Sequence, residues 1–332
     1  MCGIVGCILK NNKNAAPVLL DCISKLEYRG YDSAGIAVIN NGEVEIVKHK
    51  GRLANLSREL ENNPAEGTIG IGHTRWATHG EPSDINSHPH QASKGDITVV
   101  HNGIIENYAE LTKFLKDKGY EFKSATDTEV IPNLIHYYYN GDLFEAVAKT
   151  IERLEGSYAL GVICGNEQDK IVAVRKDSPL IVGLGDNEKF IASDIPAVLN
   201  YTRDIYLLED KEIVVITKNS AEVFNLNGEK ISKEIYKVTW NEDAAEKGGY
   251  DSFMLKEIHE QPKAIRDTMT GRVLLNDKVK FEDFNLTLEE LNEIDRIYII
   301  ACGTAYNAGL MGKVAIEKLA KIPVEVEIAS EF

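Results

Sequence analysis

Apolar residues follow two different patterns along the first 240 residues of the chain. Short runs rich in β-branched residues are typical of buried strands. Four of them are IAVI at 36–39, IVAV at 171–174, FIAS at 190–193 and EIVVIT at 212–217. Longer stretches repeat apolar residues every three or four positions, which predicts helices at 15–26, 108–118, 128–139 and 143–154. Together the two patterns predict a layered α/β domain.

The pattern changes after Trp240. Residues 241–252 begin with the polar sequence NEDAAEKGGY, which predicts a linker between a domain at 1–240 and a second region at 253–332. In the second region we predict a helix at 253–269, a strand in RIYII, a helix at 307–319 and a strand in VEVEI. One βαβ unit is too small to cover both faces of a parallel sheet, so we expect the first portion of a larger domain.

Composition narrows the classes of function. With 332 residues, 43% of them hydrophobic and 27% charged, the chain is typical of a soluble protein of about two domains. Apolar runs stay well short of the roughly 20 residues of a membrane span, and the start does not read as a signal peptide, so we expect a cytoplasmic protein. A net charge of −15 disfavours nucleic acid and anionic membranes as partners.

Five cysteines are scattered along the chain without CxxC spacing: Cys2, Cys7, Cys22, Cys164 and Cys302. Their odd number and irregular spacing argue against a disulfide framework and against a zinc site. We therefore expect reduced thiols, and we predict neither a metal nor a cofactor.

Cys2 directly follows the initiator methionine in the opening MCGIVG. Removal of Met1 would expose an α-amine with a pKa near ~8, beside a thiol with a pKa of about 8.5. The nucleophile and its base would then belong to one residue. The alternative is a small buried apolar residue, which is the usual role of a free cysteine.

Three further segments are dense in polar and small residues: EYRGYDSAG at 27–35, GHTRWATHGEPS at 72–83 and VVHNGIIEN at 99–107. With MCGIVG they resemble the class II glutamine amidotransferases, whose amidase domain is an N-terminal-nucleophile hydrolase. ATDTEV at 125–130 and ACGTAYN at 301–307 narrow the resemblance to the sugar-phosphate aminotransferases of this class, in which a sugar isomerase (SIS) domain follows the amidase.

The resemblance implies an αββα sandwich followed by a truncated βαβ portion of a doubly wound SIS domain. It also implies glutamine as the substrate of the amidase, which supplies ammonia. For the complete enzyme it implies fructose 6-phosphate as the second substrate and a homodimer that pairs through the sugar domain.

Hydrolysis of an amide requires a nucleophile, a proton acceptor and donors for the developing oxyanion. We predict that Cys2 attacks the side-chain amide of glutamine while its α-amine carries the proton, so that a γ-glutamyl thioester forms and is hydrolysed. By resemblance, Asn102 and Gly103 form the oxyanion hole. The alternative for an Asn-Gly pair is a simple turn.

The loop after residue 74 supplies candidates for substrate binding. Arg75 has a planar fork of donors that suits the α-carboxylate of glutamine, and Thr78 and His79 lie near it in the sequence. The alternative for Arg75 is a solvated surface cation. Trp76 is expected to cover the substrate, and the resemblance implies that it gates the passage of ammonia; its alternative is core packing.

Two charged residues complete the predicted site. Asp127 suits the α-ammonium of glutamine, although it also stands where a helix cap is expected, and both roles can coexist. From the family, Arg29 is expected to support the region of the N-terminal cysteine.

The histidines allow a competing interpretation. His79, His88, His90 and His101 resemble a cluster of metal ligands. They lie on separate segments, and amide hydrolysis by a thiol needs no metal, so we disfavour this reading. We instead expect His73, His88 and His101 to be buried and hydrogen-bonded.

Cys302, Gly303 and Thr304 match the start of the phosphate loop of the SIS domain, where backbone N–H groups precede a helix. Strand–glycine–helix turns are common in any βαβ unit, so the pattern alone is weak. Ala305 stands where the family often has a serine. The second phosphate loop and the isomerising residues would follow Phe332.

Two other functions remain open at this point. One is an amidophosphoribosyltransferase of purine synthesis, whose acidic, hydroxyl-rich ribose-phosphate loop is replaced here by ACGTAYNAG. The other is a regulatory module without catalysis, against which the presence of Cys2, Arg75, Asn102 and Asp127 argues.

Overall fold

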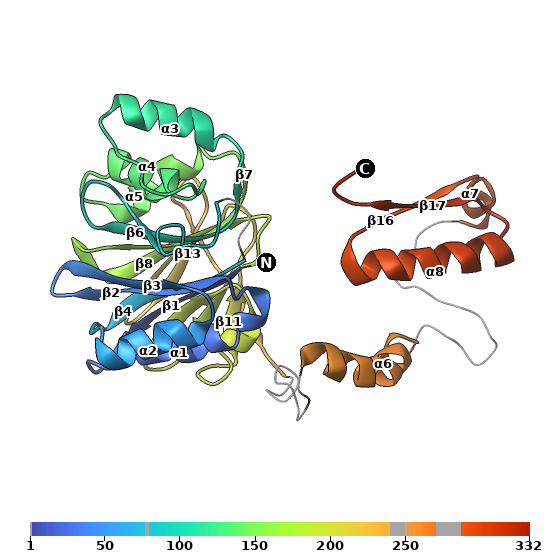
Figure 1. The fold of residues 1–332 in the computed structure, drawn as a ribbon, viewed down its shortest axis with the longest axis horizontal. Coiled ribbons are helices and arrows are strands. Elements are labelled where there is room, and N and C mark those ends of the chain that lie inside the picture. The colour runs from blue at the N-terminus through green and yellow to red at the C-terminus, as the bar shows by residue number, and fades with distance from the viewer. Residues whose placement is uncertain (1, 77–79, 240–249, 251, 270–286) are drawn as a thin grey trace. The chain divides into compact units, whose positions relative to one another are not determined.

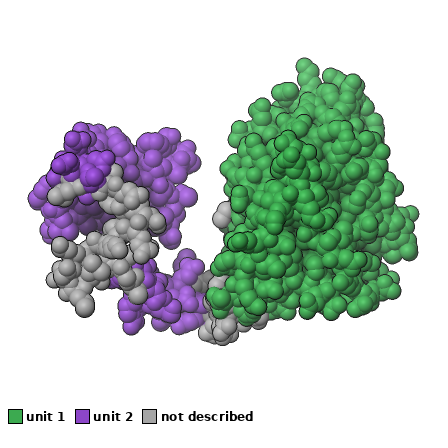
Figure 2. Space-filling view, turned by 180° about the vertical axis from the view of Figure 1, so that it is seen from behind, with its two compact units in different colours: residues 1–249 green, residues 250–332 purple. Residues whose placement is uncertain are grey.

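The computed structural model describes residues 2–76, 80–239, 250, 252–269 and 287–332. The chain divides into two compact units, Met1–Gly249 and Tyr250–Phe332, which Figure 2 shows in green and purple. The predicted linker at 241–252 falls almost entirely outside the described residues. The domain limits at 1–240 and 253–332 therefore stay predictions.

Unit 1 contains two large sheets of antiparallel strands. The first has the strand order β15-β11-β9-β10-β1-β4-β2-β3 and the second β14-β13-β12-β8-β7-β6-β5. The strands of the first sheet are β1 (Gly3–Leu9), β2 (Ser33–Asn40), β3 (Glu43–Lys50), β4 (Ile69–Arg75), β9 (Ile181–Leu184), β10 (Glu188–Ala192), β11 (Asp204–Leu207) and β15 (Tyr236–Lys237). Those of the second are β5 (His90–Gln91), β6 (Ile97–Ile105), β7 (Gly156–Cys164), β8 (Glu167–Lys176), β12 (Ile213–Thr217), β13 (Ala221–Phe224) and β14 (Lys230–Ile231).

Helices cover the outer faces of the two sheets. Along the chain they are α1 (Ala15–Ser24), α2 (Leu53–Asn62), α3 (Tyr108–Asp117), α4 (Val130–Tyr138) and α5 (Leu143–Ile151), with short 3-10 turns η1 (Glu27–Arg29) and η2 (Ile195–Ala197). The first two helices lie on one side of the sheets and the other three on the opposite side (Figure 1). The predicted αββα sandwich is confirmed.

Three apolar layers hold the four structural layers together. Because side chains alternate between the faces of a strand, β1 sends Val5 and Leu9 toward α1 and α2, and Ile4 and Ile8 toward the second sheet. In the second sheet, Val99 of β6 likewise packs with α4 and α5. The apolar runs predicted as strands are therefore continuous rather than alternating because both faces of their sheets are buried.

The predicted elements of unit 1 match the structure to within a few residues at their ends. At the helix termini, α1 ends at Ser24 and α5 at Ile151 rather than at 26 and 154. The helix predicted from residue 128 begins at Val130. The boundaries differ because apolar residues that follow a helix can pack in the core without continuing its hydrogen bonds.

Unit 2 contains α6 (Phe253–Met269), α7 (Leu288–Asn292), β16 (Ile297–Ala301), α8 (Gly303–Leu319) and β17 (Val324–Ile328). The two strands are parallel, with Ile297 opposite Val324, so the predicted βαβ unit is present. Several large apolar side chains of unit 2 are exposed, among them Tyr298, Ile300, Met311 and Val314. This exposure is expected, because the two-stranded sheet is covered by α8 on one face and is too small to form a complete core.

Among the described residues, no helix is long and apolar enough to cross a membrane.

Four histidines are buried in unit 1: His73 on β4, His88, His90 on β5 and His101 on β6. Burial lowers the pKa of His73 from its ordinary value of 6.5 to about 3, and burial also lowers the pKa of the other three. The folded protein therefore keeps these imidazoles neutral at pH values where the unfolded chain protonates them.

This difference predicts that unit 1 loses stability as the pH falls below about 6.5. The unfolded state then binds more protons than the folded state, and each buried histidine costs on the order of 1 kcal/mol of unfolding free energy per pH unit. Urea denaturation at neutral pH and about one unit below the ordinary histidine pKa measures the loss. His90→Gln should reduce the pH dependence, because it removes one buried imidazole. An equal response in wild type and in the variant would contradict the assignment.

Candidate active site

Strand pairing brings Cys2 next to the end of β4. Gly3 of β1 lies opposite Thr74 of β4, so the residue before β1 falls beside the residues that end β4. The Trp76 N–H accordingly donates to the Cys2 Sγ at 3.2 Å, and the thiol lies 3.5 Å from the Trp76 carbonyl oxygen. Burial raises the pKa of the Cys2 thiol, and the Trp76 N–H and the Arg75 charge only partly offset this effect. The thiol is therefore mostly protonated near neutral pH and needs a base to attack.

Asn102 and Gly103 lie inside β6 rather than in a turn, so the simple-turn alternative is wrong. The Asn102 Nδ2 donates to the Cys2 carbonyl oxygen at 3.0 Å. Gly103 has a φ of +125°, and a Cβ added to it would lie 2.1 Å from the Ser157 carbonyl oxygen. Only glycine fits this position, because the backbone conformation and the neighbouring strand both exclude a side chain.

Arg75 and Asp127 are buried charges on the same side of the site. The Arg75 side chain is 4% exposed, which excludes the solvated-cation alternative, and its Nη2 donates to the Gly80 carbonyl at 3.1 Å. Burial lowers the Arg75 pKa, while Cys2 and Asp127 raise it. The Asp127 Oδ2 accepts the Ile105 N–H at 2.8 Å. Asp127 does not cap α4, because Glu129 occupies the N-cap position and its side chain makes no cap bond.

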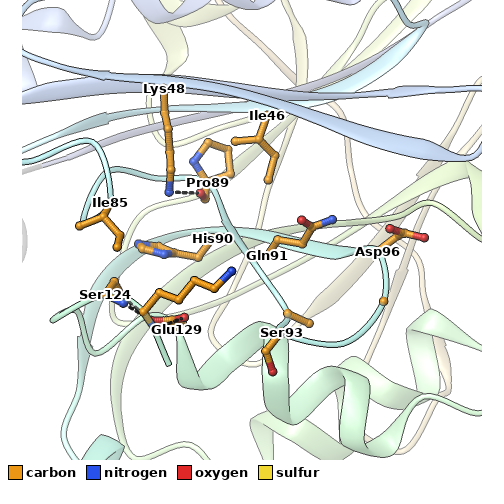
Figure 3. A pocket seen from close by; sticks show the side chains of 13 residues that line it. Ile46, Lys48, Ile85, Pro89, His90, Gln91, Ser93, Asp96, Ser124 and Glu129 are labelled. Atoms are coloured by element: carbon orange, nitrogen blue, oxygen red, sulfur yellow. Dashed lines mark hydrogen bonds between the residues drawn. The ribbon is translucent and has the colours of Figure 1, made fainter. Parts of the chain in front are cut away.

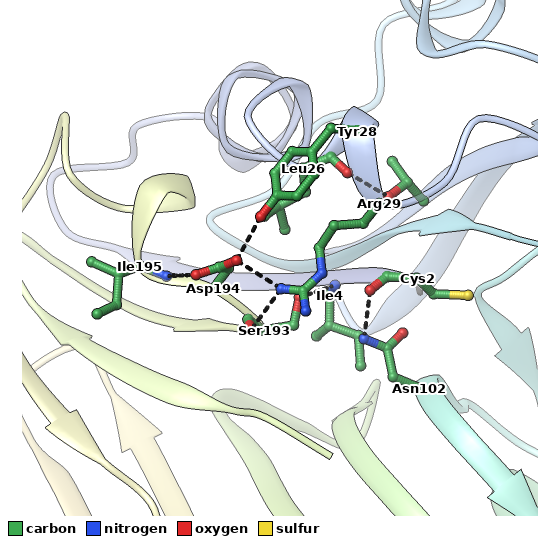
Figure 4. Close-up of polar contacts among 10 residues, drawn as sticks. Cys2, Ile4, Leu26, Tyr28, Arg29, Asn102, Ser193, Asp194 and Ile195 are labelled. Atoms are coloured by element: carbon green, nitrogen blue, oxygen red, sulfur yellow. Dashed lines mark hydrogen bonds and ion pairs between the residues drawn. The ribbon is translucent and has the colours of Figure 1, made fainter. Parts of the chain in front are cut away.

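Arg29 stabilises the first strand through an intermediate residue (Figure 4). Its Nη1 donates to the Ser193 carbonyl at 3.1 Å and pairs with the Asp194 carboxylate at 2.9 Å. Ser193 in turn bonds Ile4 twice, because its Oγ accepts the Ile4 N–H at 3.0 Å and its own N–H donates to the Ile4 carbonyl at 2.9 Å. The Tyr28 hydroxyl also donates to Asp194, at 2.6 Å. Arg29 thus acts on the backbone two residues after Cys2.

Gly30 allows the segment that carries Arg29 to approach β4. A Cβ at this position would lie 2.6 Å from the Arg75 carbonyl carbon and 2.7 Å from the Trp76 nitrogen. Any side chain would displace the backbone that donates to Cys2.

Trp76 is 44% exposed, so the core-packing alternative is wrong for this side chain. Its ring meets the edge of Tyr31 with a centroid distance of 5.4 Å. The structure thus places an exposed aromatic pair beside Cys2. Thr78 and His79 lie outside the described residues.

The expectation that His73, His88 and His101 are buried and hydrogen-bonded is confirmed. His90 is buried with them, and its Nε2 lies 3.3 Å from the Thr126 hydroxyl. Within the described part of the chain, no group of three or more His, Cys, Asp or Glu side chains is placed to hold a metal ion. His79, the fourth candidate ligand, falls outside that part.

The pocket at Cys2 is narrow, with a volume of about 20 Å³. The residues that line it are Cys2, Arg75, Trp76, His88, His101, Gly103, Thr126, Asp127 and Thr128. Most of the described candidate residues therefore meet in one place, although Asn102 contacts Cys2 without lining the pocket.

A second cavity, of about 590 Å³, is lined by residues that include Lys48, His90 and Glu129 (Figure 3). Two of its charged side chains, those of Lys48 and Glu129, are bonded within the protein. The Lys48 Nζ donates to the Ser87 and Pro89 carbonyls at 2.7 and 3.1 Å, and the Glu129 carboxylate accepts the N–H groups of Lys123 and Ser124. Burial lowers the Lys48 pKa to about 8. Volume alone would have pointed to this cavity rather than to the smaller pocket at Cys2.

The predicted sugar-phosphate loop differs from the structure. Gly303 and Thr304 form the first turn of α8 rather than a loop, and the exposed Cys302 precedes them as the N-cap residue. The helix begins four residues earlier than predicted because nothing in the small-residue sequence that follows Gly303 breaks it. Cys302 makes no side-chain cap bond.

Sequence reasoning missed Ser193 and Asp194, which connect Arg29 to β1. Ser193 is the last residue of the strand run FIAS and Asp194 follows it, and nothing in their local sequence distinguishes them from an ordinary strand end. It also missed the link from His73 to Asn102. Only the pairing of β1 with β4 and the stacking of the two sheets bring these residues together.

Two family models match the chain. A glutamine amidotransferase domain matches residues 73–200, and an SIS domain matches residues 290–332. The first match does not include Cys2, whose place in the site rests on the geometry described above.

Curated relatives match the full chain. Glutamine–fructose-6-phosphate aminotransferases of Clostridium perfringens and Clostridium tetani are each 64% identical to it over 332 residues, and that of Aquifex aeolicus is 49% identical. In each case the match covers all of this chain and 54% of the relative. The chain thus spans about half the length of the curated relatives it matches.

Solved structures share the fold. The glutamine phosphoribosylpyrophosphate amidotransferase of B. subtilis has a TM-score of 0.61 at 19% identity, covering 98% of this chain and 65% of its own. A second structure, titled the allosteric regulatory enzyme of purine biosynthesis, has a TM-score of 0.60 at 23% identity, over 68% of this chain and 49% of its own. At these identities the likeness shows the fold alone. Over the length that it spans, the chain is therefore similar to the glutamine–fructose-6-phosphate aminotransferases, with a match to a glutamine amidotransferase domain followed by a match to an SIS domain.

Proposed function

We propose that the chain hydrolyses glutamine to glutamate and ammonia through a thioester on Cys2. The observation that carries this proposal is the convergence of a thiol, a buried Arg and a buried Asp on one pocket, with an Asn amide bonded to the backbone of the residue that carries the thiol. In the complete enzyme, we propose that the ammonia aminates fructose 6-phosphate in the synthesis of glucosamine 6-phosphate.

The raised pKa of the thiol makes a base necessary. Removal of Met1 would place a neutral α-amine on the same residue as the thiol, within reach directly or through one water. The amine accepts the thiol proton as the sulfur attacks the side-chain carbonyl of glutamine. It then gives the proton to the departing nitrogen, which leaves as ammonia. In the second step, the amine takes a proton from water, the hydroxide attacks the thioester, and glutamate departs as the thiol is restored.

Donors for the oxyanion are available on β6. The Asn102 Nδ2 faces Cys2 and lies 3.0 Å from the Cys2 carbonyl oxygen. The Gly103 N–H follows it in the strand, and Gly103 lines the pocket at Cys2. We propose that these two donors stabilise the negative oxygen of the tetrahedral intermediate.

Arg75 and Asp127 suit the two charges of an amino acid. We propose that the guanidinium binds the α-carboxylate and that the carboxylate binds the α-ammonium. Both side chains are held in place by backbone partners, Gly80 and Ile105 respectively, so little side-chain entropy is lost on binding. The same pairing rejects simple amides that lack the two charges.

We also propose a covering role for Trp76, with Thr78 and His79 contributing from the same loop. The exposure of the Trp76 ring and its position directly after Arg75 support movement over a bound substrate. Gating of ammonia by Trp76 is proposed from the resemblance. Arg29 would act through Ser193 to keep Cys2 in place.

Unit 2 would belong to the sugar half of the reaction. We propose that Cys302, Gly303 and Thr304 contribute to phosphate binding in the complete sugar domain, and that these 332 residues alone carry the ammonia-releasing step. The cytoplasmic location, the homodimer and the lack of nucleic-acid and membrane partners remain predictions from sequence.

Cys2→Ala should abolish the release of glutamate from glutamine, because no other thiol lines the pocket among the described residues. Cys302→Ala is the matched control, since it removes an exposed thiol from unit 2 and should leave the rate unchanged. An assay that couples glutamate formation to a dehydrogenase measures both variants. Turnover in the Cys2 variant would show that the nucleophile is misassigned.

Asp127→Asn should lower kcat/KM for glutamine by about 10–100-fold, chiefly through KM, because it removes one charged hydrogen bond of roughly 1.5–3 kcal/mol. The amide oxygen can still accept the Ile105 N–H, so the local fold should persist. Asp142→Asn serves as the control because that carboxylate also accepts a backbone N–H, at the start of α5. Steady-state kinetics of both variants measure the effect. An unchanged KM in Asp127→Asn would refute the proposal that Asp127 binds the α-ammonium of glutamine.

A further inference from the structure

His73 makes a bifurcated contact that links the buried histidines to the candidate oxyanion hole. Its Nε2 lies 3.0 Å from the His101 carbonyl oxygen and 3.0 Å from the Asn102 Oδ1. His73 does not line the pocket at Cys2, so it has no direct contact with a substrate there.

The contact with the carbonyl determines which ring nitrogen of His73 carries the proton. A carbonyl oxygen can only accept a hydrogen bond, so Nε2 must be the donor. The other nitrogen, Nδ1, is buried and has no hydrogen-bond partner among the described residues. Burial keeps the ring neutral, which allows a single N–H. His73 therefore presents one fixed donor toward β6.

The same logic determines the orientation of the Asn102 amide. At one end the His73 N–H requires an acceptor, and at the other end the Cys2 carbonyl oxygen requires a donor. Only one of the two amide orientations satisfies both, with Oδ1 toward His73 and Nδ2 toward Cys2. The two backbone carbonyls, of His101 and Cys2, thus define the direction of the whole hydrogen-bond chain.

Neighbouring rings hold His73 in place. The His88 ring stacks on it with a centroid distance of 4.1 Å. The His88 Nδ1 accepts the His101 N–H at 3.3 Å, so its proton is on Nε2, which faces the Thr128 hydroxyl at 3.4 Å. That hydroxyl lies 2.9 Å from the His101 Nδ1. Backbone groups orient the rings of His73 and His88, the Thr128 hydroxyl contacts that of His101, and none of these contacts needs a charge.

We propose that His73 is a positioning residue of the glutaminase, whose Nε2–H orients the Asn102 amide so that Nδ2 is available to the oxyanion. The inference rests on the proposed function of the Cys2 site. Without the His73 donor the Asn102 amide can rotate and present its oxygen to the developing negative charge. The barrier then rises even though Asn102 itself is unchanged.

Two substitutions of His73 with side chains of similar length separate the effect of the lost donor from the effect of a changed side-chain volume. His73→Gln retains an amide N–H near the position of Nε2, whereas His73→Met does not. We expect His73→Met to lower kcat for glutamine hydrolysis by roughly 10²–10³, the cost of losing one oxyanion donor, while KM changes little. His73→Gln should recover most of that loss. His90→Met controls for a general effect of repacking the cluster, because none of its described contacts involve Asn102.

Alkylation of Cys2 by iodoacetamide measures the reactivity of the thiol without an oxyanion. The sulfur displaces iodide from a saturated carbon, and no negatively charged oxygen forms in that reaction. Its rate should be the same in wild type, His73→Met and His73→Gln. A double mutant should also be non-additive, because His73→Met has little left to remove once Asn102→Ala is present.

Three results would overturn the proposal: a normal kcat in folded His73→Met, an equal loss in His90→Met, or a parallel loss of alkylation. If His73→Met does not fold, His73→Gln serves as the test. A kcat loss beyond about tenfold in folded His73→Gln would then overturn the proposal, because this variant retains the donor. Failure of the proposed function is distinguishable, because wild type itself would then release no glutamate.

Discussion

The pairing of β1 on both of its edges is the constraint on which the site depends. Chain termini usually fray, but β1 lies between β10 and β4 and is hydrogen-bonded to both. The residue that precedes it therefore has a defined position one step beyond the Gly3–Thr74 pair. A catalytic role for the start of a polypeptide is physically reasonable only where the terminus is held in this way.

Around this strand, hydrogen bonds reach the terminus from three directions. Asn102 binds the Cys2 carbonyl from the second sheet, Trp76 binds the thiol from the end of β4, and Ser193 binds Ile4 from the other neighbouring strand. Buried polar groups of this kind are costly unless they are paired, and then they favour one arrangement. The neutral histidines make such bonds through His73 Nε2, His88 Nδ1 and His101 Nδ1 without adding charge to the interior, whereas His73 Nδ1 and His101 Nε2 have no hydrogen-bond partner among the described residues.

The element pattern and most of the chemistry could be predicted from sequence. Apolar periodicity located the strands and helices of unit 1, and the motifs singled out Cys2, Arg75, Asn102 and Asp127 as residues that the structure does bring together. The roles of these residues remain predictions, because their chemistry has to be tested in solution.

What sequence could not predict depends on register and on contacts between distant segments. The partner of Asp127 is a backbone N–H on β6 rather than α4, which local sequence cannot reveal. Ser193 and His73 have no motif of their own and become significant only through the strands beside them. The early start of α8 shows the same limit, since small residues are compatible with both a loop and a helix.

The most direct test of the account is to trap the reaction intermediate on the chain. Turnover with glutamine is quenched in acid, the protein is digested, and the N-terminal peptide is analysed by mass spectrometry. The account predicts a peptide that begins at Cys2 and carries one glutamyl group on that residue. Active protein whose N-terminal peptide still contains Met1, or whose glutamyl group lies on another cysteine, would contradict it.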